Sequence, residues 1–202
     1  MASTNMKVGG IVLCGGHSRR MGTSKATLRW ADECLLNRVL RLVGEVVSPV
    51  VVAARRGQDL PPNPPGVQLI YDKEDGVGPL AGLAAGFECL ASRCDAAFVI
   101  ACDQPLVRPD FVRRMIELLG EHQAVVPEHG GRRHPLTAIY RLSTRATLLD
   151  LLSNRVRRAT MFSDACHARI VSATDFTTSD PTMQSLRNFN TPEEFRTLQD
   201  GE

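Results

Sequence analysis

Runs of apolar, often β-branched residues recur along this chain, and glycine, proline or polar residues separate them. Continuous apolar runs of this length are typical of strands buried on both faces. They predict strands over residues 8–13, 50–54, 67–71 and 96–102. Between these runs, apolar residues follow helical spacing or a proline opens an apolar stretch, as in amphipathic helices. The predicted helices cover residues 35–46, 79–91 and 109–119.

The order of these segments predicts an α/β fold. Strands that alternate with helices form doubly wound, mainly parallel sheets whose crossover connections are right-handed. Two further apolar segments, residues 124–126 and 136–140, flank Gly130 and Gly131, which favours an antiparallel, hairpin-like addition at one edge. Weaker helical patterns cover residues 143–152 and 192–198. No repeat or linker interrupts the chain, so we expect one domain over residues 1–202.

Composition and charge exclude several classes of protein. The chain is 43% hydrophobic, which suits a folded core and argues against a disordered chain. Its 24 basic and 22 acidic residues leave a net charge of +2, far from the strongly basic balance of nucleic-acid-binding domains. No uncharged run exceeds twelve residues, which is too short to span a membrane, and residues 1–7 lack the features of a signal peptide. We therefore expect a cytoplasmic protein that binds neither nucleic acid nor membranes.

Glycines, cations and carboxylates follow three of the predicted strands. They are Gly15, Gly16, Arg19, Arg20 and Lys25 after the first strand, Asp72 after the third and Asp103 after the fourth. Because ligands of doubly wound sheets bind outside the carboxyl ends of the strands, we expect these residues at one edge. Glycines expose backbone N–H groups to anions, cations neutralise phosphates, and a carboxylate can hold Mg²⁺. The combination predicts a site for a nucleoside triphosphate.

Three common types of site do not fit the sequence. Five residues separate Gly16 from Gly22, and Lys25 lies three residues past Gly22, which excludes a P-loop. Residues 76–82 contain a proline and place the last glycine one residue too far for a dinucleotide-binding fingerprint. The six cysteines form no C-x-x-C pair, so neither a zinc site nor a disulfide framework is indicated.

Five sequence blocks resemble those of a known family. They are L-C-G-G-x-S-R-R-M-G-x-x-K at residues 13–25, G-P-L-A-G at 78–82, C-D-x-P at 102–105, R-H-P at 133–135 and N-T-P-E-E at 190–194. In this order they resemble the molybdenum cofactor guanylyltransferases. The resemblance implies a Rossmann-like nucleotidyltransferase fold and a Mg²⁺-dependent transfer of GMP from GTP to molybdopterin, with release of pyrophosphate. It also implies transient contact with proteins that supply molybdopterin or mature molybdoenzymes.

The resemblance also implies roles for individual residues. It assigns Leu13, Cys14 and Gly15 to the nucleotide loop, Lys25 to phosphate binding, Asp72 to a contact with GTP and Asp103 to Mg²⁺. With Gly16 and Arg19 from the same loop, these are the candidate nucleotide-binding residues, and Lys25 and Asp103 are the candidate catalytic residues. Two positions depart from the family pattern. Ser24 stands where many relatives have Asp, which removes a second acidic group near the metal, and Ala53 stands where many have Asn, which removes a contact with the nucleoside.

Other interpretations of the same residues stay open. Asp72 and Asp103 are also ordinary turn residues, and Lys25 could lie on the surface. Lys25 is, however, one of only three lysines beside 21 arginines, and it closes a glycine-rich loop. The opening block also resembles those of cytidylyl and sugar-phosphate nucleotidyltransferases, so transfer of another nucleotide is an alternative function. A non-catalytic carrier of the pterin nucleotide is a further alternative, although a carrier needs no carboxylate for Mg²⁺.

Overall fold

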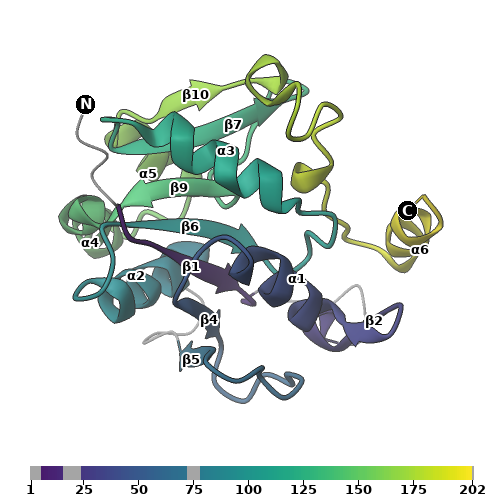
Figure 1. Ribbon diagram of the computed structural model, residues 1–202. Helices are drawn as coiled ribbons and strands as arrows, with labels where there is room; N and C mark the ends of the chain where they lie inside the picture. Colours follow the sequence, from purple (N-terminus) through teal and green to yellow (C-terminus); the bar gives the residue numbers. More distant parts are fainter. Residues whose placement is uncertain (1–5, 16–23, 72–77, 202) are drawn as a thin grey trace.

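The predicted parallel strands form one half of a mixed sheet (Figure 1). The computed structural model describes residues 6–15, 24–71 and 78–201. Within these residues, eight strands join in one sheet in the order β10-β7-β9-β6-β1-β4-β5, with β8 paired to β7. The parallel strands of this half, which extends from β6 at the centre to β5 at one edge, are β1 (Val8–Leu13), β4 (Val50–Ala54), β5 (Gln68–Tyr71) and β6 (Ala96–Ala101). All four coincide with predicted strands, and the predicted α/β fold class is confirmed.

The remaining strands extend the sheet on the β6 side. They are β7 (Ala124–His129), β8 (Arg132–Arg133), β9 (Ala138–Arg141) and β10 (Arg169–Val171). Strand β9 lies between β6 and β7 and is antiparallel to both, which is the predicted antiparallel addition. Strand β10 then pairs parallel with β7, so the sheet continues one strand beyond the predicted edge. The sequence carries no signal for β10 because only Val171 of its three residues is buried.

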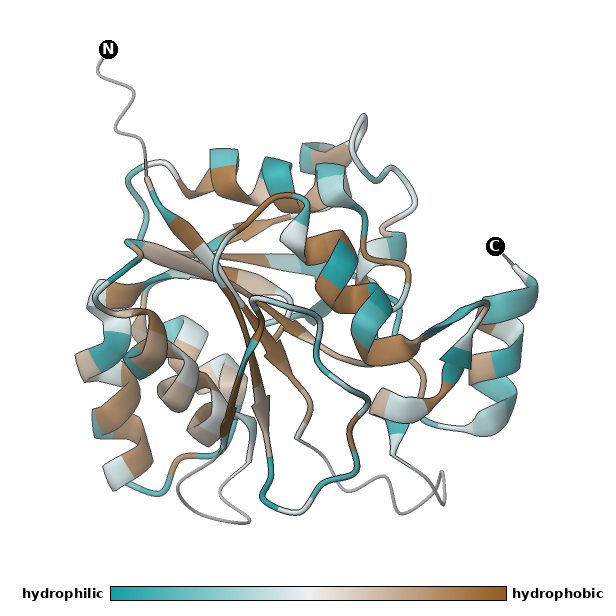
Figure 2. Ribbon diagram, turned by 60° about the horizontal axis from the view of Figure 1, so that its bottom comes forward, coloured by the Kyte–Doolittle hydropathy of each residue, from teal (hydrophilic) through white to brown (hydrophobic). Residues whose placement is uncertain are grey.

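Helices cover both faces of the sheet and divide the core into two layers. One layer contains α1 (Leu35–Gly44) and α3 (Pro109–Leu119), and the other contains α2 (Pro79–Leu90), α4 (Arg145–Ser153) and α5 (Ala159–Ala165). Along β1, Val12 faces the first layer while Ile11 and Leu13 face the second, which explains why the run is apolar throughout. In Figure 2 the central strands are brown, and the helices beside them show both brown and teal residues, as amphipathic helices do. None of the described helices is long and apolar enough to cross a membrane.

A small apolar cluster lies beside the main sheet. A hairpin of β2 (Arg29–Trp30) and β3 (Glu33–Cys34) and the C-terminal helix α6 (Pro192–Asp200) contribute to it, and Figure 1 shows both elements at one end of the molecule. Its buried members are Trp30, Leu35, Leu106, Phe189 and Leu198. The rings of Trp30 and Phe195 also pack in a T-shaped arrangement, with a centroid distance of 5.6 Å. The cluster therefore fixes the last part of the chain against the segment that begins at Lys25.

Gly86 lies inside α2, where the helix packs on β1. A Cβ atom at this position would lie 2.6 Å from Cδ1 of Ile11, whose side chain is fully buried. Gly86→Ala should therefore destabilise the fold by about 1–3 kcal/mol through overpacking, even though alanine favours a helix. Gly44, the last residue of α1, has no atom within 4 Å of such a Cβ, so Gly44→Ala is the matched control and should leave stability unchanged or slightly higher. Urea unfolding compares the two variants, and a Gly86→Ala midpoint at or above that of the wild type would contradict the close approach.

Candidate active site

The carboxyl ends of β1 and β6 lie side by side at the centre of the sheet. Leu13 pairs in register with Ala101, and Cys102 donates its backbone N–H to the carbonyl of Leu13 over 3.0 Å. On the other side of β1, Cys14 donates its N–H to the carbonyl of Ala53 over 2.8 Å. The chain passes from β1 to β4 on one side of β1 and later returns to β6 on its other side. The crossover connections therefore run in opposite directions from β1. Ligands of doubly wound sheets bind at such a point.

Lys25 and Asp103 meet at this point, although 78 residues separate them in the sequence. Nζ of Lys25 donates to Oδ2 of Asp103 over 2.8 Å, and the two side chains are 13% and 16% exposed. Lys25 opens a short 3₁₀ turn (Lys25–Thr27) anchored by the buried Ala26, and Asp103 follows the end of β6. The ion pair is therefore held by buried backbone on both sides and still reaches solvent. The structure thus brings together the two candidate catalytic residues.

The C-terminal part of the chain supplies two more acceptors for Lys25. Its Nζ donates to the carbonyl of Phe189 and, over 3.4 Å, to Oδ1 of Asn190. The same ammonium lies 4.8 Å from the centroid of the Phe189 ring, within the range of a cation–π interaction. An ammonium has three N–H donors, so each of them has an acceptor in the protein. These contacts could not be predicted from the sequence, because 164 residues separate Lys25 from Phe189.

The N-T-P-E-E block explains how Asn190 reaches this position. Thr191 caps α6, because its Oγ1 accepts the N–H of Glu194 over 3.2 Å. The carboxylate of Glu194 accepts the N–H of Asn190 over 2.5 Å, which closes a reciprocal pair similar to a capping box. Pro192 takes the first helical turn, where its missing N–H is not needed. The block is therefore a helix start that holds Asn190 beside Lys25.

The turn after β1 is held by side chains from neighbouring segments. Gln58 donates from Nε2 to the carbonyl of Cys14 over 2.7 Å and accepts the N–H of Arg55 at Oε1 over 3.3 Å. The Cys14 thiol is buried, and a hydrogen bond with Cys102, followed by burial, raises its pKa well above the ordinary value. Cys14 is therefore a neutral thiol at pH 7 and no nucleophile. The sequence pattern did not single out Gln58, because its loop has no apolar periodicity.

The other predicted nucleotide-binding residues divide into two groups. Leu13 is buried in the core layer of α2, so only its backbone can meet a ligand, and Gly15 lines a cleft beside Asp103. Gly16, Arg19 and Asp72 lie outside the described residues.

The two positions that depart from the family pattern also lie at this edge. Ala53 is buried near the end of β4 and presents no polar side-chain atom. Ser24 directly precedes Lys25, and its Oγ is buried with no hydrogen-bond partner among the described residues.

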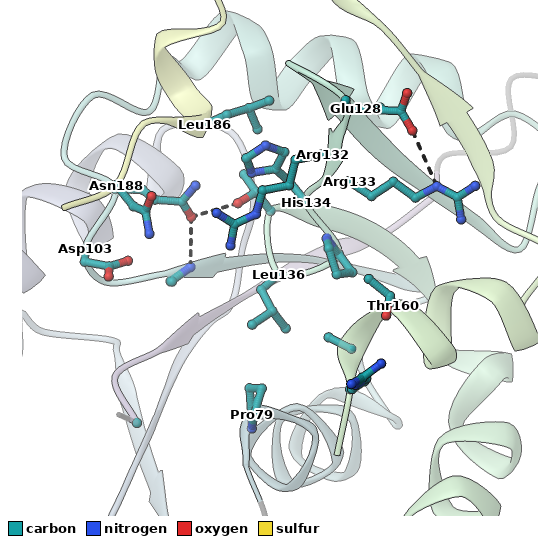
Figure 3. Close-up of a pocket in the computed structure, with 18 residues that line it drawn as sticks. Pro79, Asp103, Glu128, Arg132, Arg133, His134, Leu136, Thr160, Leu186 and Asn188 are labelled. Carbon is teal, nitrogen blue, oxygen red and sulfur yellow. Dashed lines mark hydrogen bonds and ion pairs between the residues drawn. The ribbon is translucent and has the colours of Figure 1, made fainter. Parts of the chain in front are cut away.

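A cleft of about 920 Å³ opens beside Asp103 (Figure 3). Asp103 and Gly15 line one part of it, and the segments 131–137 and 158–160 line another. Four basic side chains line this second part: Arg132, Arg133, His134 and Arg158. In Figure 3, Asp103 and Asn188 lie on the left of the cleft, while Arg133 and Thr160 lie on the right. The cleft therefore continues from the Lys25–Asp103 pair toward a cationic wall.

The arginines of this cationic wall differ in their ion pairs. Arg133 is paired with Glu128 over 3.5 Å and with Asp164 over 2.7 Å. Among the residues that the structure describes, Arg132 and Arg158 form no ion pair. His134 is partly buried, and burial, followed by the nearby Arg132 and His129, lowers its pKa, so its ring is mostly neutral at pH 7. The positive charges that the wall offers to an anionic ligand are therefore those of Arg132 and Arg158.

The chemistry of Asp103 fits a role in holding Mg²⁺. No group of three or more His, Cys, Asp or Glu side chains that could hold a metal occurs within residues 6–15, 24–71 and 78–201. Mg²⁺ commonly uses one or two protein carboxylates together with substrate phosphates and water. Asp103 is such a carboxylate, because it is partly exposed at a strand end and Lys25 engages its Oδ2. This donor set suits a metal ion that binds together with a phosphate ligand.

Comparison with known sequences points to one family. Residues 10–168 match the model of the MobA-like NTP transferase domain. A curated relative from Chloroflexus aggregans, named "Probable molybdenum cofactor guanylyltransferase", is 32% identical over 201 residues, which cover 96% of this chain and 95% of the relative. A relative of the same name from Methanothermobacter thermautotrophicus is 34% identical over 195 residues, with 92% and 95% of the two chains covered.

Solved structures share the fold. The molybdopterin-guanine dinucleotide biosynthesis protein A of Archaeoglobus fulgidus superposes with a TM-score of 0.77 at 22% identity, over 95% of this chain and 97% of that chain. The 2-C-methyl-D-erythritol 4-phosphate cytidylyltransferase of Thermus thermophilus superposes with a TM-score of 0.68 at 16% identity, over 94% and 96% of the two chains. At these identities the likeness concerns the fold, which agrees with the predicted nucleotidyltransferase fold.

Proposed function

Because this chain belongs to the molybdenum cofactor guanylyltransferases of the MobA-like NTP transferase family, we propose that it transfers GMP from GTP to molybdopterin. The observation that carries the proposal is the Lys25–Asp103 ion pair, which lies where crossovers part and opens onto a cleft with a cationic wall. We also propose that residues 1–202 act as one nucleotidyltransferase domain, since segments from Gly15 to Asn190 contribute to one site at the edge of a single sheet.

In the proposed reaction, an oxygen of the terminal phosphate of molybdopterin attacks the α-phosphorus of GTP. A new P–O bond forms, the bond from the α-phosphorus to the bridging oxygen breaks, and pyrophosphate leaves with that electron pair. Transfer of this type needs little covalent help, so positioning and charge neutralisation supply most of the acceleration. Lys25 contributes by exchanging its protein acceptors for phosphate oxygens. Mg²⁺, when bound at Asp103, supplies further neutralisation of the triphosphate.

The cationic wall suits the molybdopterin phosphate. The planar guanidinium groups of Arg132 and Arg158 match the geometry of a phosphate and have no carboxylate partner among the described residues. The neutral ring of His134 adds one donor and one acceptor. A phosphate monoester has a second pKa near ~6, so at pH 7 it is already an anion and needs no protein base. The acceptor instead needs shielding from the charge of GTP, which the two arginines provide.

The proposed function is tested by incubating the pure protein with Mg²⁺, molybdopterin and GTP. Release of pyrophosphate together with a guanylylated pterin is the expected result, and both should depend on Mg²⁺. Binding of the pterin nucleotide with no release of pyrophosphate would identify a non-catalytic carrier instead.

We expect GTP to be used in preference to CTP and ATP. The nucleoside would lie on the β4 side of β1, because the cationic wall occupies the β9 side. On the β4 side, the carbonyls of Leu13 and Cys14 each keep a second lone pair and the carboxamide of Gln58 keeps a second N–H, which can read a base edge, whereas the side chain of Ala53 offers no polar group. The missing Asn should weaken nucleotide binding without reversing the preference. Competition between equal concentrations of GTP and CTP checks this, and a mainly cytidylylated product would overturn the choice of nucleotide.

A further inference from the structure

Gln104 directly follows Asp103, and its side chain is buried, with 4% of the residue exposed. Its Oε1 accepts two hydrogen bonds, from the N–H of Ala101 over 3.2 Å and from the hydroxyl of Thr137 over 2.8 Å. Its Nε2 donates to the carbonyl of Ser185 over 3.3 Å. Thr137 and Ser185 lie 33 and 81 residues away in the sequence. One carboxamide therefore joins three segments that are distant along the chain.

Each of these segments reaches the cleft. Ala101 ends β6 just before Asp103, and Thr137 closes the segment 134–137, which lines the cationic wall. Ser185 precedes the segment 186–189, which contributes two cleft residues and the carbonyl that accepts from Lys25. The hydrogen bonds of Gln104 thus connect the Asp103 turn to the wall of the cleft and to the segment that holds Lys25.

Ser185 is itself held in place. Asp180 is fully buried, and its carboxylate accepts the N–H of Gln184 over 3.0 Å and the N–H of Ser185 over 2.8 Å. The Oγ of Ser185 accepts the N–H of Arg108 over 3.0 Å. The carbonyl that Gln104 contacts therefore belongs to a well-fixed turn, against which a second segment can be aligned.

We infer that Gln104 is a positioning residue that fixes the molybdopterin-binding wall of the cleft, through Thr137 and Ser185, relative to Asp103. The inference rests on the proposed function, because molybdopterin is the ligand that this wall would hold. A carboxamide suits the role because it accepts and donates hydrogen bonds at the same time. Gln104 lies at the cleft lining, but both ends of its carboxamide are hydrogen-bonded to the protein, so it acts through these partners.

Two variants of Thr137 separate positioning from packing. Thr137 is 3% exposed, so both of its side-chain groups are buried. Thr137→Val keeps the shape of the side chain and removes the hydroxyl that donates to Gln104. Thr137→Ser keeps this hydroxyl and removes a methyl group. If the hydrogen bond positions the wall, Thr137→Val should raise KM for molybdopterin about tenfold and leave the Kd of Mg²⁺–GTP unchanged. Thr137→Ser should have a KM for molybdopterin close to that of the wild type. If Thr137 acted only through packing, Thr137→Ser would have the higher KM of the two variants.

Thr144 provides the matched control. It is a buried threonine that also donates its hydroxyl, to the carbonyl of Arg141 over 2.7 Å, and it does not line the cleft. Thr144→Val should keep the wild-type KM for molybdopterin. A rise in KM equal to that of Thr137→Val would show a general effect of losing a buried hydroxyl, and would overturn the inference.

Gln104→Met tests the centre of the network. Methionine keeps most of the length but makes none of the three hydrogen bonds, so KM for molybdopterin should rise and kcat should also fall about tenfold, because the segment 186–189 is released near Lys25. If Gln104→Met does not fold, the KM values of Thr137→Val and Thr137→Ser still test the inference. A wild-type protein that transfers no GMP overturns the proposed function and the inference with it. An active wild type with equal KM values in Thr137→Val and Thr137→Ser overturns the inference alone.

Discussion

Replacement of Lys25 with alanine is expected to lower kcat/KM for GMP transfer by about 10²–10³-fold, because one preorganised positive charge beside the triphosphate is lost. The fold should lose about 1–3 kcal/mol, since the carboxylate of Asp103 and the carbonyl of Phe189 each lose a donor. Kinetics are therefore compared at a temperature well below the unfolding midpoints of both proteins.

Lys7→Ala is the matched control for Lys25→Ala. Lys7 is an exposed lysine that precedes β1, at the opposite end of the strand from the site. The variant removes the same charge from the protein without touching the cleft, so its transfer rate should equal that of the wild type. Near-normal turnover of Lys25→Ala would remove Lys25 from the phosphate site.

Asp103→Asn is expected to lower the transfer rate by a similar factor of about 10²–10³. The change keeps the size of the side chain and an oxygen that can still accept from Lys25, so the fold should be retained. It removes the negative charge that Mg²⁺ prefers in its ligands, and the Mg²⁺ concentration needed for half-maximal rate should rise. A titration of rate against Mg²⁺ at saturating GTP measures this.

Asp95 offers the comparison for Asp103. It directly precedes β6, at the other end of the same strand, and its carboxylate accepts the N–H of Lys7 over 2.8 Å at an exposed position. Asp95→Asn should leave both the rate and its Mg²⁺ dependence unchanged. If Asp103→Asn responds to Mg²⁺ as the wild type does, Asp103 does not hold the metal.

The parts of the fold that were predictable are those in which burial is continuous along the chain. Strands β1, β4 and β6 are buried on both faces, and their runs of apolar residues mark them clearly. The elements that were missed are short and mostly exposed. Strand β10 has one buried residue, and β2 has two residues, of which one is buried. Such elements form because other strands pair with them, and the local pattern of apolar residues does not show which strands these are.

The candidate site divides in the same way. Lys25 and Asp103 could be predicted to meet, because both follow strands whose carboxyl ends share one edge of a parallel sheet. Phe189, Gln104 and Thr137 could not, because their roles depend on hydrogen bonds between segments that only the complete fold brings together. The N-T-P-E-E block was visible as a motif, but its action, a helix cap that holds Asn190, required the structure.

The contacts of Lys25 bear on the sequence of events in a catalytic cycle. Before a ligand binds, all three N–H donors of its ammonium are used, by Asp103, Phe189 and Asn190. A triphosphate that binds Lys25 must therefore replace existing partners, so at least one of these three residues loses its hydrogen bond to Lys25. Asn188 is the neighbour of Phe189 along the chain and lines the cleft, so we expect a release at Phe189 to change the cleft in which molybdopterin is proposed to bind. We therefore expect ordered binding, in which the nucleotide comes first and the cleft takes its final shape only afterwards.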